Sequence, residues 1–332
     1  MTTSTQVLLD NRPAGAVTRE NFRIVETALP PLQDGEVLVR NEWLSLDPYM
    51  RGRMSDAKSY VKPVDVGAVM TGQTVGEVIE SRHPGFRRGD RVLTGLGWQS
   101  HGIARGKELR LVDTSQVPAS YYLGVLGMPG LTAWFGLFEL GKPKAGETVV
   151  VSAATGAVGS VVGQLAKAKG CRAVGIAGGR EKCDYAVREL GYDACVDYKA
   201  GNLREDLKAA CDKGIDVDFE NVGGAVLDTV LRQMNLFGRV VVCGLIAEYS
   251  SEKPYAYTAM RSVLVNRLKV QGMIVFDWAE RYGEALADLG ARVATHQLKY
   301  RESIVDGLEN APQGLIDLLA GRNFGKQLVR IR

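Results

Sequence analysis

Two patterns of apolar and polar positions follow one another along the 332-residue chain. Up to about residue 120, apolar positions alternate with polar ones over short runs, which glycine, proline and aspartate interrupt. Alternation with this punctuation is typical of β-strands that have one buried face. We therefore expect a compact β-rich domain, either barrel-like or a sandwich. Its clearest strand candidates are residues 35–46, 71–81, 89–96 and 108–113.

From about Tyr121 the pattern changes to short apolar runs that alternate with segments of helical periodicity. Strands that alternate with helices of 10–15 residues indicate a parallel, doubly wound sheet. The predicted strands are residues 147–153, 172–178, 193–198, 215–224, 239–247 and 267–276. The predicted helices are residues 156–170, 180–191, 203–214, 225–238 and 278–294.

The last segment of the chain, residues 300–331, does not continue the alternating series. It reads as a helix, a glycine turn and a short strand, and we expect it to return to the first domain. The sequence thus predicts a β-rich domain made of residues 1–122 and 296–332. The α/β domain would span residues 123–295.

Composition narrows the range of functions. The net charge is +3 with both signs well mixed, which argues against a nucleic acid or a membrane surface as the partner. The five cysteines form no C-x-x-C pair, and their odd number favours free thiols in a reducing compartment. The N-terminus lacks a signal-peptide pattern, so we expect a cytoplasmic protein. Residues 148–166 carry no charge, but a strand, turn and helix explain them better than a membrane span.

A glycine-containing turn, "SAATGAVG", lies between the first strand and first helix of the α/β series. The dinucleotide fingerprint G-x-G-x-x-G occupies this position, and here Ala154 replaces its first glycine. Gly156 would let the backbone approach a pyrophosphate, and Gly159 would let the helix pack tightly on its strand. The helix N-terminus would then face the anion. The alternative is a glycine-containing turn without a ligand.

The end of the second predicted strand indicates which dinucleotide would bind. NAD enzymes place an acidic residue there to hold the ribose 2′-hydroxyl. This chain has Gly178 and Gly179, followed by Arg180 and Lys182. Cations attract a 2′-phosphate, so the sequence favours NADP(H). The alternative is that these charges form only the solvated first turn of a helix.

Two further side chains fall at strand ends, where open α/β sheets bind their ligands. Asn221 follows the strand "DVDFE", and Tyr249 lies in "CGLIAEYS" after the next strand. Both would reach the same edge of the sheet. The alternative for each is an ordinary turn residue.

These segments together resemble the medium-chain dehydrogenase/reductase superfamily. They resemble most its zinc-independent branch of prostaglandin reductases, plant double-bond reductases and bacterial NADPH-dependent curcumin reductases. The resemblance rests on "LSLDPYMRGRMSD", "GVLGMPGLTAWFGL", "SAATGAVG", "GGREK", "IDVDFENVGG", "CGLIAEYS" and "GLENAPQGLIDLLAGRNFGK". It implies a GroES-like catalytic domain beside a Rossmann NADP-binding domain. It also implies a homodimer formed through the last parallel strand.

The resemblance implies a set of cofactor contacts at matching positions. The pyrophosphate would lie on Gly156, Ala157, Val158 and Gly159, and the 2′-phosphate on Lys182 and Tyr198. The nicotinamide half would lie against Asn221, Cys243, Gly244, Leu245, Ile246, Tyr249, Met273, Ile274, Val275 and, from the returning tail, Asn323.

A catalytic metal is not expected. Zinc-dependent relatives carry Gly-His-Glu where this chain has Gly72-Gln73-Thr74, and neither Gln73 nor Thr74 is a usual zinc ligand. The three histidines have no partner at ligand spacing. We interpret Gly72 and Gly76 as glycines that leave room for the backbone beside a cleft. Residues 72–74 would then occupy the position of a zinc site that has lost its ligands.

Without a Lewis acid, reduction of a C=C bond conjugated to a carbonyl needs less help than oxidation of an alcohol. Hydride goes to the β-carbon, donors stabilise the enolate, and the α-carbon takes a proton. We assign Tyr249 as the oxyanion donor and Tyr49 as proton donor or substrate positioner. A cofactor ribose hydroxyl or water are alternatives for these roles, and Tyr49 could instead be a packed aromatic. Met50, Met54, Trp98 and Tyr255 are candidates for an apolar substrate wall, with core packing as the alternative.

The sequence therefore predicts an NADPH-dependent reductase of α,β-unsaturated ketones or aldehydes, with curcumin-like substrates included. A quinone reductase is a close alternative. A non-catalytic NADPH-binding scaffold is a second alternative, from a different class.

Overall fold

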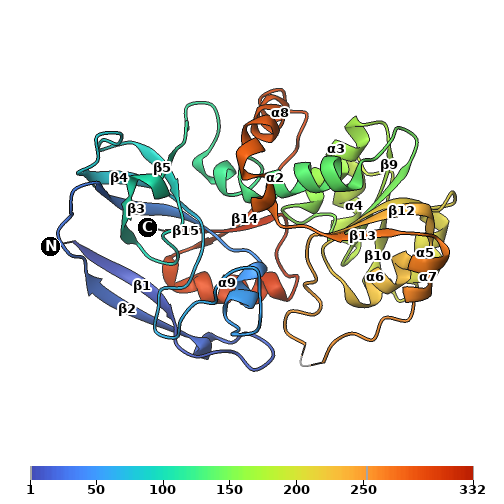
Figure 1. Ribbon diagram of the computed structural model, residues 1–332, viewed down its shortest axis with the longest axis horizontal. Coiled ribbons are helices and arrows are strands. Elements are labelled where there is room, and N and C mark those ends of the chain that lie inside the picture. The colour runs from blue at the N-terminus through green and yellow to red at the C-terminus, as the bar shows by residue number, and fades with distance from the viewer. Residues whose placement is uncertain (1, 252, 332) are drawn as a thin grey trace. The chain divides into compact units, whose positions relative to one another are not determined.

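The computed structural model describes residues 2–251 and 253–331 and divides into two compact units. Unit 1 comprises Met1–Gly124 and Glu302–Arg332, and unit 2 comprises Val125–Arg301. Figure 1 shows the elements of both units coloured along the chain. No helix within the described residues combines the length and apolar character that a bilayer crossing requires.

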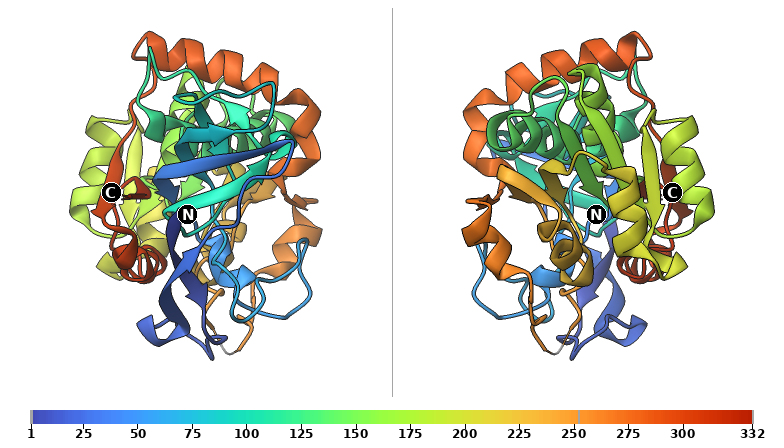
Figure 2. Two further views of the ribbon diagram at one scale, coloured as in Figure 1. Left: turned by 90° about the vertical axis from the view of Figure 1, so that its left-hand side faces the viewer. Right: turned by 90° about the vertical axis from the view of Figure 1, so that its right-hand side faces the viewer.

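Unit 1 is built on a seven-stranded, largely antiparallel sheet, as the alternating pattern predicts. Six of its strands follow the order β14-β15-β3-β4-β5-β7, and β6 pairs with β3. A separate antiparallel pair, β1 and β2, is drawn in dark blue in Figure 2. The elements are β1 (Thr3–Leu9), η1 (Arg19–Asn21), β2 (Phe22–Ala28), β3 (Glu36–Ser45), α1 (Tyr49–Arg53), β4 (Thr74–Ser81), β5 (Arg91–Thr94), β6 (His101–Arg105), η2 (Gly106–Glu108), β7 (Arg110–Leu111), η3 (Ala119–Leu123), β14 (Glu302–Asp306), η7 (Leu308–Asn310), α9 (Ala311–Leu319) and β15 (Lys326–Arg330).

The end of the chain adds two strands to this sheet. β15 pairs antiparallel with β3 and parallel with β14. Helix α9 supplies Leu315 and Leu318 to a buried cluster that also contains Leu44. β14 is an element that the sequence pattern does not predict.

Three residues predicted as a substrate wall belong to the same buried cluster. Met50, Met54 and Trp98 are all 0% exposed, and the Trp98 ring stacks on Phe22 with 5.3 Å between ring centroids. Core packing, the alternative left open, is the role of all three. Tyr255 lies in unit 2 and is partly exposed.

Unit 2 holds the predicted parallel sheet, with strand order β10-β9-β8-β11-β12-β13. This is the doubly wound order of Rossmann folds, in which the first strand lies at the centre. The elements are α2 (Met128–Phe135), η4 (Gly136–Gly141), β8 (Thr148–Ser152), α3 (Gly159–Ala168), β9 (Arg172–Ala177), α4 (Arg180–Arg188), β10 (Ala194–Asp197), η5 (Tyr198–Ala200), α5 (Leu203–Ala210), β11 (Ile215–Glu220), α6 (Gly224–Leu231), β12 (Met234–Val242), α7 (Met260–Val265), β13 (Lys269–Gly272), η6 (Val275–Arg281) and α8 (Tyr282–Ala294).

The direction of the strand order reverses between β8 and β11. Crossovers between parallel strands are right-handed, so α3 and α4 cover one face of the sheet, while α5, α6 and α7 cover the other (Figure 1). Residues such as Val150, Val174 and Val240 on the second face pack against Leu207 and Val230 of these helices. The reversal creates the crevice at which such sheets bind ligands.

Several element boundaries differ from the sequence prediction, including those of one helix and one strand. The predicted helix over 225–238 ends at Leu231, and Met234–Gly238 begins β12 instead. The predicted strand over 267–276 shortens to Lys269–Gly272. The Asn235 side chain explains the first difference, because it donates to Asp216 Oδ1 at 2.8 Å and to the Lys213 carbonyl at 3.0 Å. Those contacts come from distant residues that local periodicity does not reveal.

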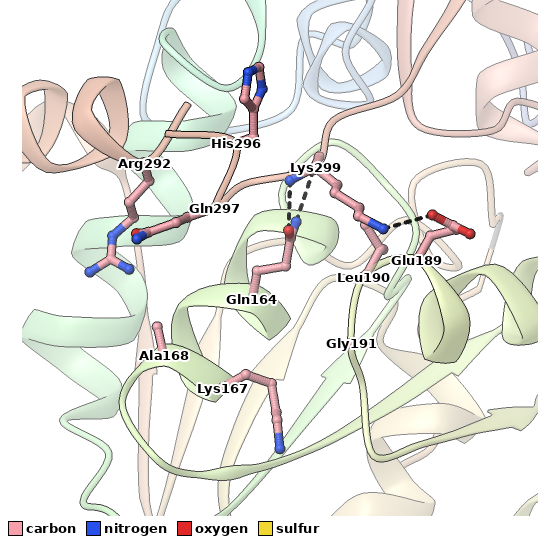
Figure 3. A pocket seen from close by; sticks show the side chains of 10 residues that line it. All are labelled: Gln164, Lys167, Ala168, Glu189, Leu190, Gly191, Arg292, His296, Gln297 and Lys299. Atoms are coloured by element: carbon pink, nitrogen blue, oxygen red, sulfur yellow. Dashed lines mark hydrogen bonds and ion pairs between the residues drawn. The ribbon is translucent and has the colours of Figure 1, made fainter. Parts of the chain in front are cut away.

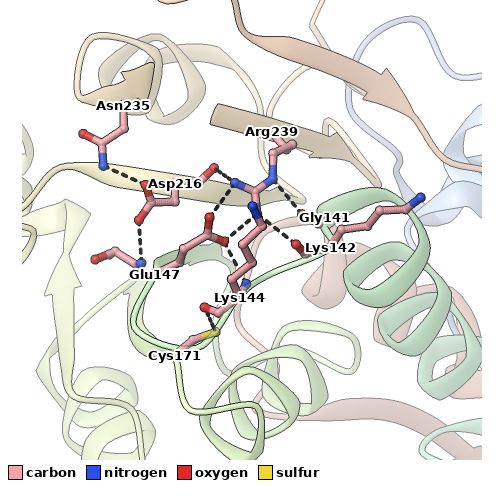
Figure 4. Close-up of polar contacts among 9 residues, drawn as sticks. Gly141, Lys142, Lys144, Glu147, Cys171, Asp216, Asn235 and Arg239 are labelled. Carbon is pink, nitrogen blue, oxygen red and sulfur yellow. Dashed lines mark hydrogen bonds and ion pairs between the residues drawn. The ribbon is translucent and has the colours of Figure 1, made fainter. Parts of the chain in front are cut away.

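An arginine ties the amino ends of the central strands together (Figure 4). The Arg239 guanidinium donates to both carboxylate oxygens of Glu147, at 2.6 and 3.1 Å, and to the Gly141 carbonyl at 2.8 Å. Asp216 accepts from the Thr148 N–H at 2.8 Å and belongs to the same group. These contacts fasten β8, β11 and β12 at the edge opposite to their carboxyl ends.

Candidate active site

The predicted cofactor residues of unit 2 gather at one edge of its sheet. Each lies at or just beyond the carboxyl end of a parallel strand, which is where the fold places ligands. The segments follow the strands in this way: Gly156, Ala157, Val158 and Gly159 after β8, Lys182 after β9, Tyr198 after β10, Asn221 after β11, Cys243, Gly244, Leu245, Ile246 and Tyr249 after β12, and Met273, Ile274 and Val275 after β13.

The turn between β8 and α3 is tightly packed. Ala153 has a positive φ of 49°, and the Ala154 N–H donates to the Ile176 carbonyl on β9 at 3.1 Å. A Cβ atom on Gly159 would lie 2.4 Å from the Ala153 carbonyl oxygen, so only glycine fits. Helix α3 begins at Gly159, and no side chain caps its N-terminus. The N-terminus of a helix is positively polarised, so this turn is a place where an anion could bind.

Two lysines and a tyrosine meet at the ends of β9 and β10. A Cβ on Gly178 would lie 2.9 Å from the Tyr198 ring and hydroxyl and 3.0 Å from Lys199 Cε. Burial and the nearby Lys199 ammonium both lower the pKa of Lys182. Two cations that repel one another at a glycine-lined strand end suit a bound phosphate. Sequence reasoning missed Lys199, although it follows Tyr198 directly; the basic residue after that tyrosine was the available signal.

Glu220 joins the ends of β8 and β11. Its carboxylate accepts from the Ser152 hydroxyl at 2.5 Å and from the Gly223 N–H at 3.0 Å. The Asn221 side chain donates to the Ser152 carbonyl at 2.8 Å. Asn221 is thus held beside the β8 turn rather than being an ordinary exposed turn residue. Ser152 and Glu220 are further residues that sequence reasoning did not single out, because their contacts join distant segments.

Tyr249 folds back over the end of β12. Its hydroxyl oxygen accepts the Leu245 N–H at 3.2 Å, and a Cβ on Gly244 would lie 3.1 Å from that oxygen. The Ile246 N–H donates to the Asn221 carbonyl at 3.2 Å, which joins this loop to the end of β11. The structure therefore brings Tyr249, Gly244 and Asn221 together.

The predicted cofactor residues after β12 and β13 include several apolar ones. Burial, followed by the Glu220 charge, raises the pKa of Cys243 to about 12, which keeps this thiol neutral. Met273 is 5% exposed, and its N–H donates to the Val242 carbonyl at 3.0 Å. Ile274 and Val275 follow it into a 3-10 helix.

Tyr49 and Asn323 lie in unit 1. Tyr49 begins α1 and packs against the buried cluster of that unit. Burial and the Asp47 charge raise its pKa, so the hydroxyl stays protonated and can donate. Asn323 precedes β15, and its side chain donates to the Gly325 carbonyl at 2.9 Å. The core-packing reading of Tyr49 is confirmed, and its role as a proton donor or substrate positioner stays a prediction.

The glycines around Gln73 provide clearance against a neighbouring strand instead of a cleft. A Cβ on Gly76 would lie 2.3 Å from the Arg40 carbonyl oxygen of β3, and one on Gly72 would lie 2.8 Å from a Leu44 methyl. Thr74 begins β4 and is 0% exposed. Within the described ranges, no three His, Cys, Asp or Glu side chains gather as a metal site would require.

A surface cavity of about 550 Å³ lies elsewhere in unit 2 (Figure 3). It is formed by the C-terminal ends of α3 and α4 and the segment after α8, hence near the amino ends of the strands. Lys167 pairs with Asp193, and Lys299 pairs with Glu189, each at 2.8 Å. These cations are already neutralised, so the cavity is not the predicted phosphate site.

Comparison with known proteins matches both units. A family described as "N-terminal domain of oxidoreductase" matches residues 5–112, and one described as "Zinc-binding dehydrogenase" matches residues 157–291. The NADPH-dependent curcumin reductase of Escherichia coli is 50% identical, over 98% of this chain and 96% of that protein. The NADP⁺-dependent 2-alkenal reductase of Nicotiana tabacum is 40% identical, over 98% and 97%.

The fold is also that of a solved relative. The crystal structure of CurA from Vibrio vulnificus in complex with NADPH is 48% identical, covers 99% of each chain and superposes with a TM-score of 0.95. Identity at this level over the whole length shows common descent as well as a common fold. The chain belongs to the medium-chain dehydrogenase/reductase superfamily, in the branch that includes bacterial curcumin reductases, plant alkenal reductases and prostaglandin reductases.

Proposed function

We propose that the protein uses NADPH to reduce the C=C bond of α,β-unsaturated ketones and aldehydes. The observation that carries this proposal is the 50% and 40% identity, over 98% of the chain, to proteins named curcumin reductase and 2-alkenal reductase. Curcumin and 2-alkenals differ in size but share a C=C bond conjugated to a carbonyl. The shared group is therefore the substrate class that we infer.

The residues of unit 2 fit NADPH. The uncapped N-terminus of α3 and the close-packed Gly159 suit a pyrophosphate. Lys182 and Lys199, with Tyr198, suit the 2′-phosphate, and the glycines at the end of β9 offer no carboxylate to repel it. We propose these residues, with Asn221, Cys243–Ile246, Tyr249, Met273–Val275 and Asn323, as the cofactor contacts.

When bound, NADPH supplies a hydride to the β-carbon of the substrate. Negative charge then develops on the carbonyl oxygen, and a hydrogen bond from the Tyr249 hydroxyl would stabilise it. The Leu245 N–H holds the Tyr249 oxygen in place, so the donor is oriented before charge develops. We propose Tyr249 as the oxyanion donor on this ground.

Tyr49 is the proposed proton donor or substrate positioner. Its raised pKa means that the phenol is protonated at neutral pH and acts as a hydrogen-bond donor. Loss of the phenol proton to the α-carbon would leave a phenolate, which solvent can reprotonate. Delivery of that proton by water, with Tyr49 as a positioner, is the alternative.

The reaction class is tested with a panel of substrates. We expect NADPH oxidation with 2-alkenals and enones, a saturated product, and a much lower rate with NADH. Saturated ketones and aldehydes should give no turnover, because they lack the conjugated bond. Turnover with quinones alone would instead establish the quinone reductase alternative, and absence of turnover with every acceptor would support a scaffold.

The role of Tyr249 is tested by Tyr249→Phe. We expect kcat with an enone to fall about 10²- to 10³-fold, the usual loss when one oxyanion donor is removed. The NADPH dissociation constant, measured by fluorescence titration, should change little. Tyr185→Phe is the matched control, since Tyr185 lies on α4 under Arg301 and away from the strand ends. Unchanged turnover of Tyr249→Phe would remove the assignment.

We further propose that the protein acts as a homodimer in the cytoplasm. β13 forms the edge of its sheet, and Val270 on it is 45% exposed. Phe237 and Leu264 in neighbouring segments are 64% and 79% exposed. An apolar edge strand can pair with its copy about a twofold axis. The five free thiols favour a reducing compartment.

A further inference from the structure

A lysine in unit 1 is buried together with its counter-ion. Lys326, the first residue of β15, is 1% exposed as a side chain, and Asp47 is 7% exposed. Lys326 Nζ lies 2.9 Å from Asp47 Oδ1. For comparison, the side chains of the Arg239–Glu147 pair are 18% and 20% exposed. Burying two charges is unfavourable unless both are fully hydrogen-bonded.

Both members of the pair are satisfied. The ammonium also donates to the Leu46 carbonyl at 2.7 Å and to the Gln327 carbonyl at 3.1 Å, so all three of its hydrogens are used. Asp47 Oδ2 accepts the Ser45 hydroxyl. A further acid, Glu302, lies near Lys326. Burial raises its pKa, and its carboxyl group accepts from the Ser120 hydroxyl at 3.0 Å.

One side of this pair leads directly to Tyr49. Leu46 and Asp47 supply two of the three acceptors, and Asp47 precedes Pro48 and Tyr49 in the chain. The Asp47 carbonyl accepts the Met50 N–H at 3.0 Å and so forms the start of α1. The position of the Tyr49 backbone therefore depends on where Asp47 is held.

The other side leads to Asn323. Lys326 follows the turn 322–325, in which the Asn323 amide donates to the Gly325 carbonyl. The Phe324 N–H donates to the Ser303 hydroxyl at 3.0 Å, which fixes the turn to β14. Tyr49 and Asn323 are the two predicted site residues of unit 1, and each lies two or three residues from the pair.

We propose that Lys326 and Asp47 are positioning residues, whose buried ion pair fixes the Tyr49 segment to the Asn323 turn. The proposal rests on the proposed function for its kinetic consequence. Neither residue is assigned contact with the substrate. The pair sets the relative position of the substrate-side tyrosine and the cofactor-side amide within unit 1.

The test separates charge from packing. Lys326→Met and Asp47→Asn each leave one buried polar group without its partner and should lower the melting temperature. The double variant Lys326→Met/Asp47→Asn removes both charges and should recover most of that loss. If the pair positions Tyr49, the double variant should fold but exchange its amide hydrogens faster than the wild type in residues 46–54 and 320–326. Its kcat with an enone should fall at least about tenfold.

A double-mutant cycle tests whether the ion pair affects kcat through Tyr49. Tyr49→Phe should reduce kcat much less in the double-variant background than in the wild type, because the tyrosine is already misplaced there. Arg330→Met/Asp306→Asn is the matched control. It removes an ion pair between β15 and β14 whose side chains are 48% and 43% exposed, so exchange and kcat should stay at wild-type values.

Two results would overturn the proposal. One is a folded double variant with wild-type exchange in both segments and wild-type kcat. The other is a full, additive loss from Tyr49→Phe in both backgrounds. Absence of enone reduction by the wild-type protein would contradict the proposed function only. Hydrogen exchange would still show whether the ion pair fixes the two segments.

Discussion

Asp218 and Glu147 are carboxyl groups of the same unit, but their surroundings shift their pKa values in opposite directions. Asp218 on β11 is 0% exposed, and neither of its carboxylate oxygens has a partner in the described structure. Burial and the Glu220 charge raise its pKa. Burial acts the same way on Glu147, but hydrogen bonds from Arg239 and Lys144 outweigh it and lower the pKa. At the residue scale, the presence or absence of hydrogen-bond donors decides whether the pKa of these two carboxyl groups is lowered or raised.

Asp218→Val should stabilise the protein increasingly as pH rises. The native pKa lies well above the unfolded value of about 3.8, so wild-type stability declines as pH rises from that value towards the native pKa. The decline is at most about 1.4 kcal/mol for each pH unit, and the variant lacks it. Urea unfolding at pH 4.5, 6 and 7.5 measures the difference.

For Glu147→Gln we expect a stability change whose pH dependence is opposite in sign to that of Asp218→Val. A lowered pKa contributes stability above the unfolded value near 4.5, and that contribution is lost as pH falls through the folded pKa. The loss caused by the variant should therefore be largest at neutral pH and shrink under acid. A constant Asp218→Val difference across the pH range would contradict the assignment of a raised pKa.

Lys182→Ala should weaken the binding of NADPH but not that of NADH. Loss of one charge-assisted hydrogen bond to the 2′-phosphate corresponds to a rise of about 10- to 100-fold in KM for NADPH. KM for NADH should stay the same, since NADH lacks that phosphate. Lys208→Ala on α5, an exposed lysine outside the strand ends, is the control. An equal rise in KM for NADPH and NADH would show that Lys182 does not contact the 2′-phosphate.

At the scale of elements, α3 and its turn show which parts of the site are readable from sequence. The turn and helix 156–170 were predicted from local glycine spacing, because the backbone geometry of such a turn requires glycine at fixed positions. The strand Met234–Gly238 was predicted as helix, because the contact of Asn235 with Asp216 is not local. The proximity of Lys199 to Gly178 likewise arises only when β9 and β10 pair.

Gly159→Ala tests the close approach at this turn. The added Cβ would meet the Ala153 carbonyl oxygen at 2.4 Å and Ala154 Cα at 3.0 Å, and backbone atoms cannot move aside easily. We expect a loss of about 1–3 kcal/mol in stability and weaker NADPH binding. The melting temperature and a fluorescence titration measure both.

Gly290→Ala is the matched substitution in another helix. Nothing lies within 4 Å of a Cβ at this position of α8, so the change should stabilise by about 0.5–1 kcal/mol. If Gly159→Ala behaved in the same way as Gly290→Ala, the tight turn would not govern cofactor binding.

At the scale of the whole molecule, each unit carries part of the proposed chemistry. Tyr249, the proposed oxyanion donor, and the proposed phosphate contacts lie in unit 2, while Tyr49 and Asn323 lie in unit 1. The sequence alone predicts both folds, because binary patterns and strand–helix alternation are local signals. The buried pair Lys326–Asp47 joins residues at opposite ends of the chain, so no local pattern predicts it.

The proposed homodimer is tested by light scattering after size-exclusion chromatography. We expect a mass of twice the 36.0 kDa chain. Leu264→Glu combined with Phe237→Glu should shift the protein to the monomer, because each places a charge on the apolar surface beside β13. Ile24→Glu on β2, where an apolar side chain is 46% exposed, should leave the mass unchanged. A monomeric wild type would remove the proposal.

The Arg239 contacts have a consequence for how this protein could diversify. They hold β8, β11 and β12 together at the edge that carries no proposed chemistry, so the sheet does not depend on the loops at its opposite edge alone. New loop sequences after β11, β12 and β13 could therefore be selected for other substrates with little penalty to folding. Laboratory evolution of substrate scope would then keep Leu245, Ile246 and Tyr249 fixed and begin at residues 253–256, which have no proposed catalytic or cofactor role.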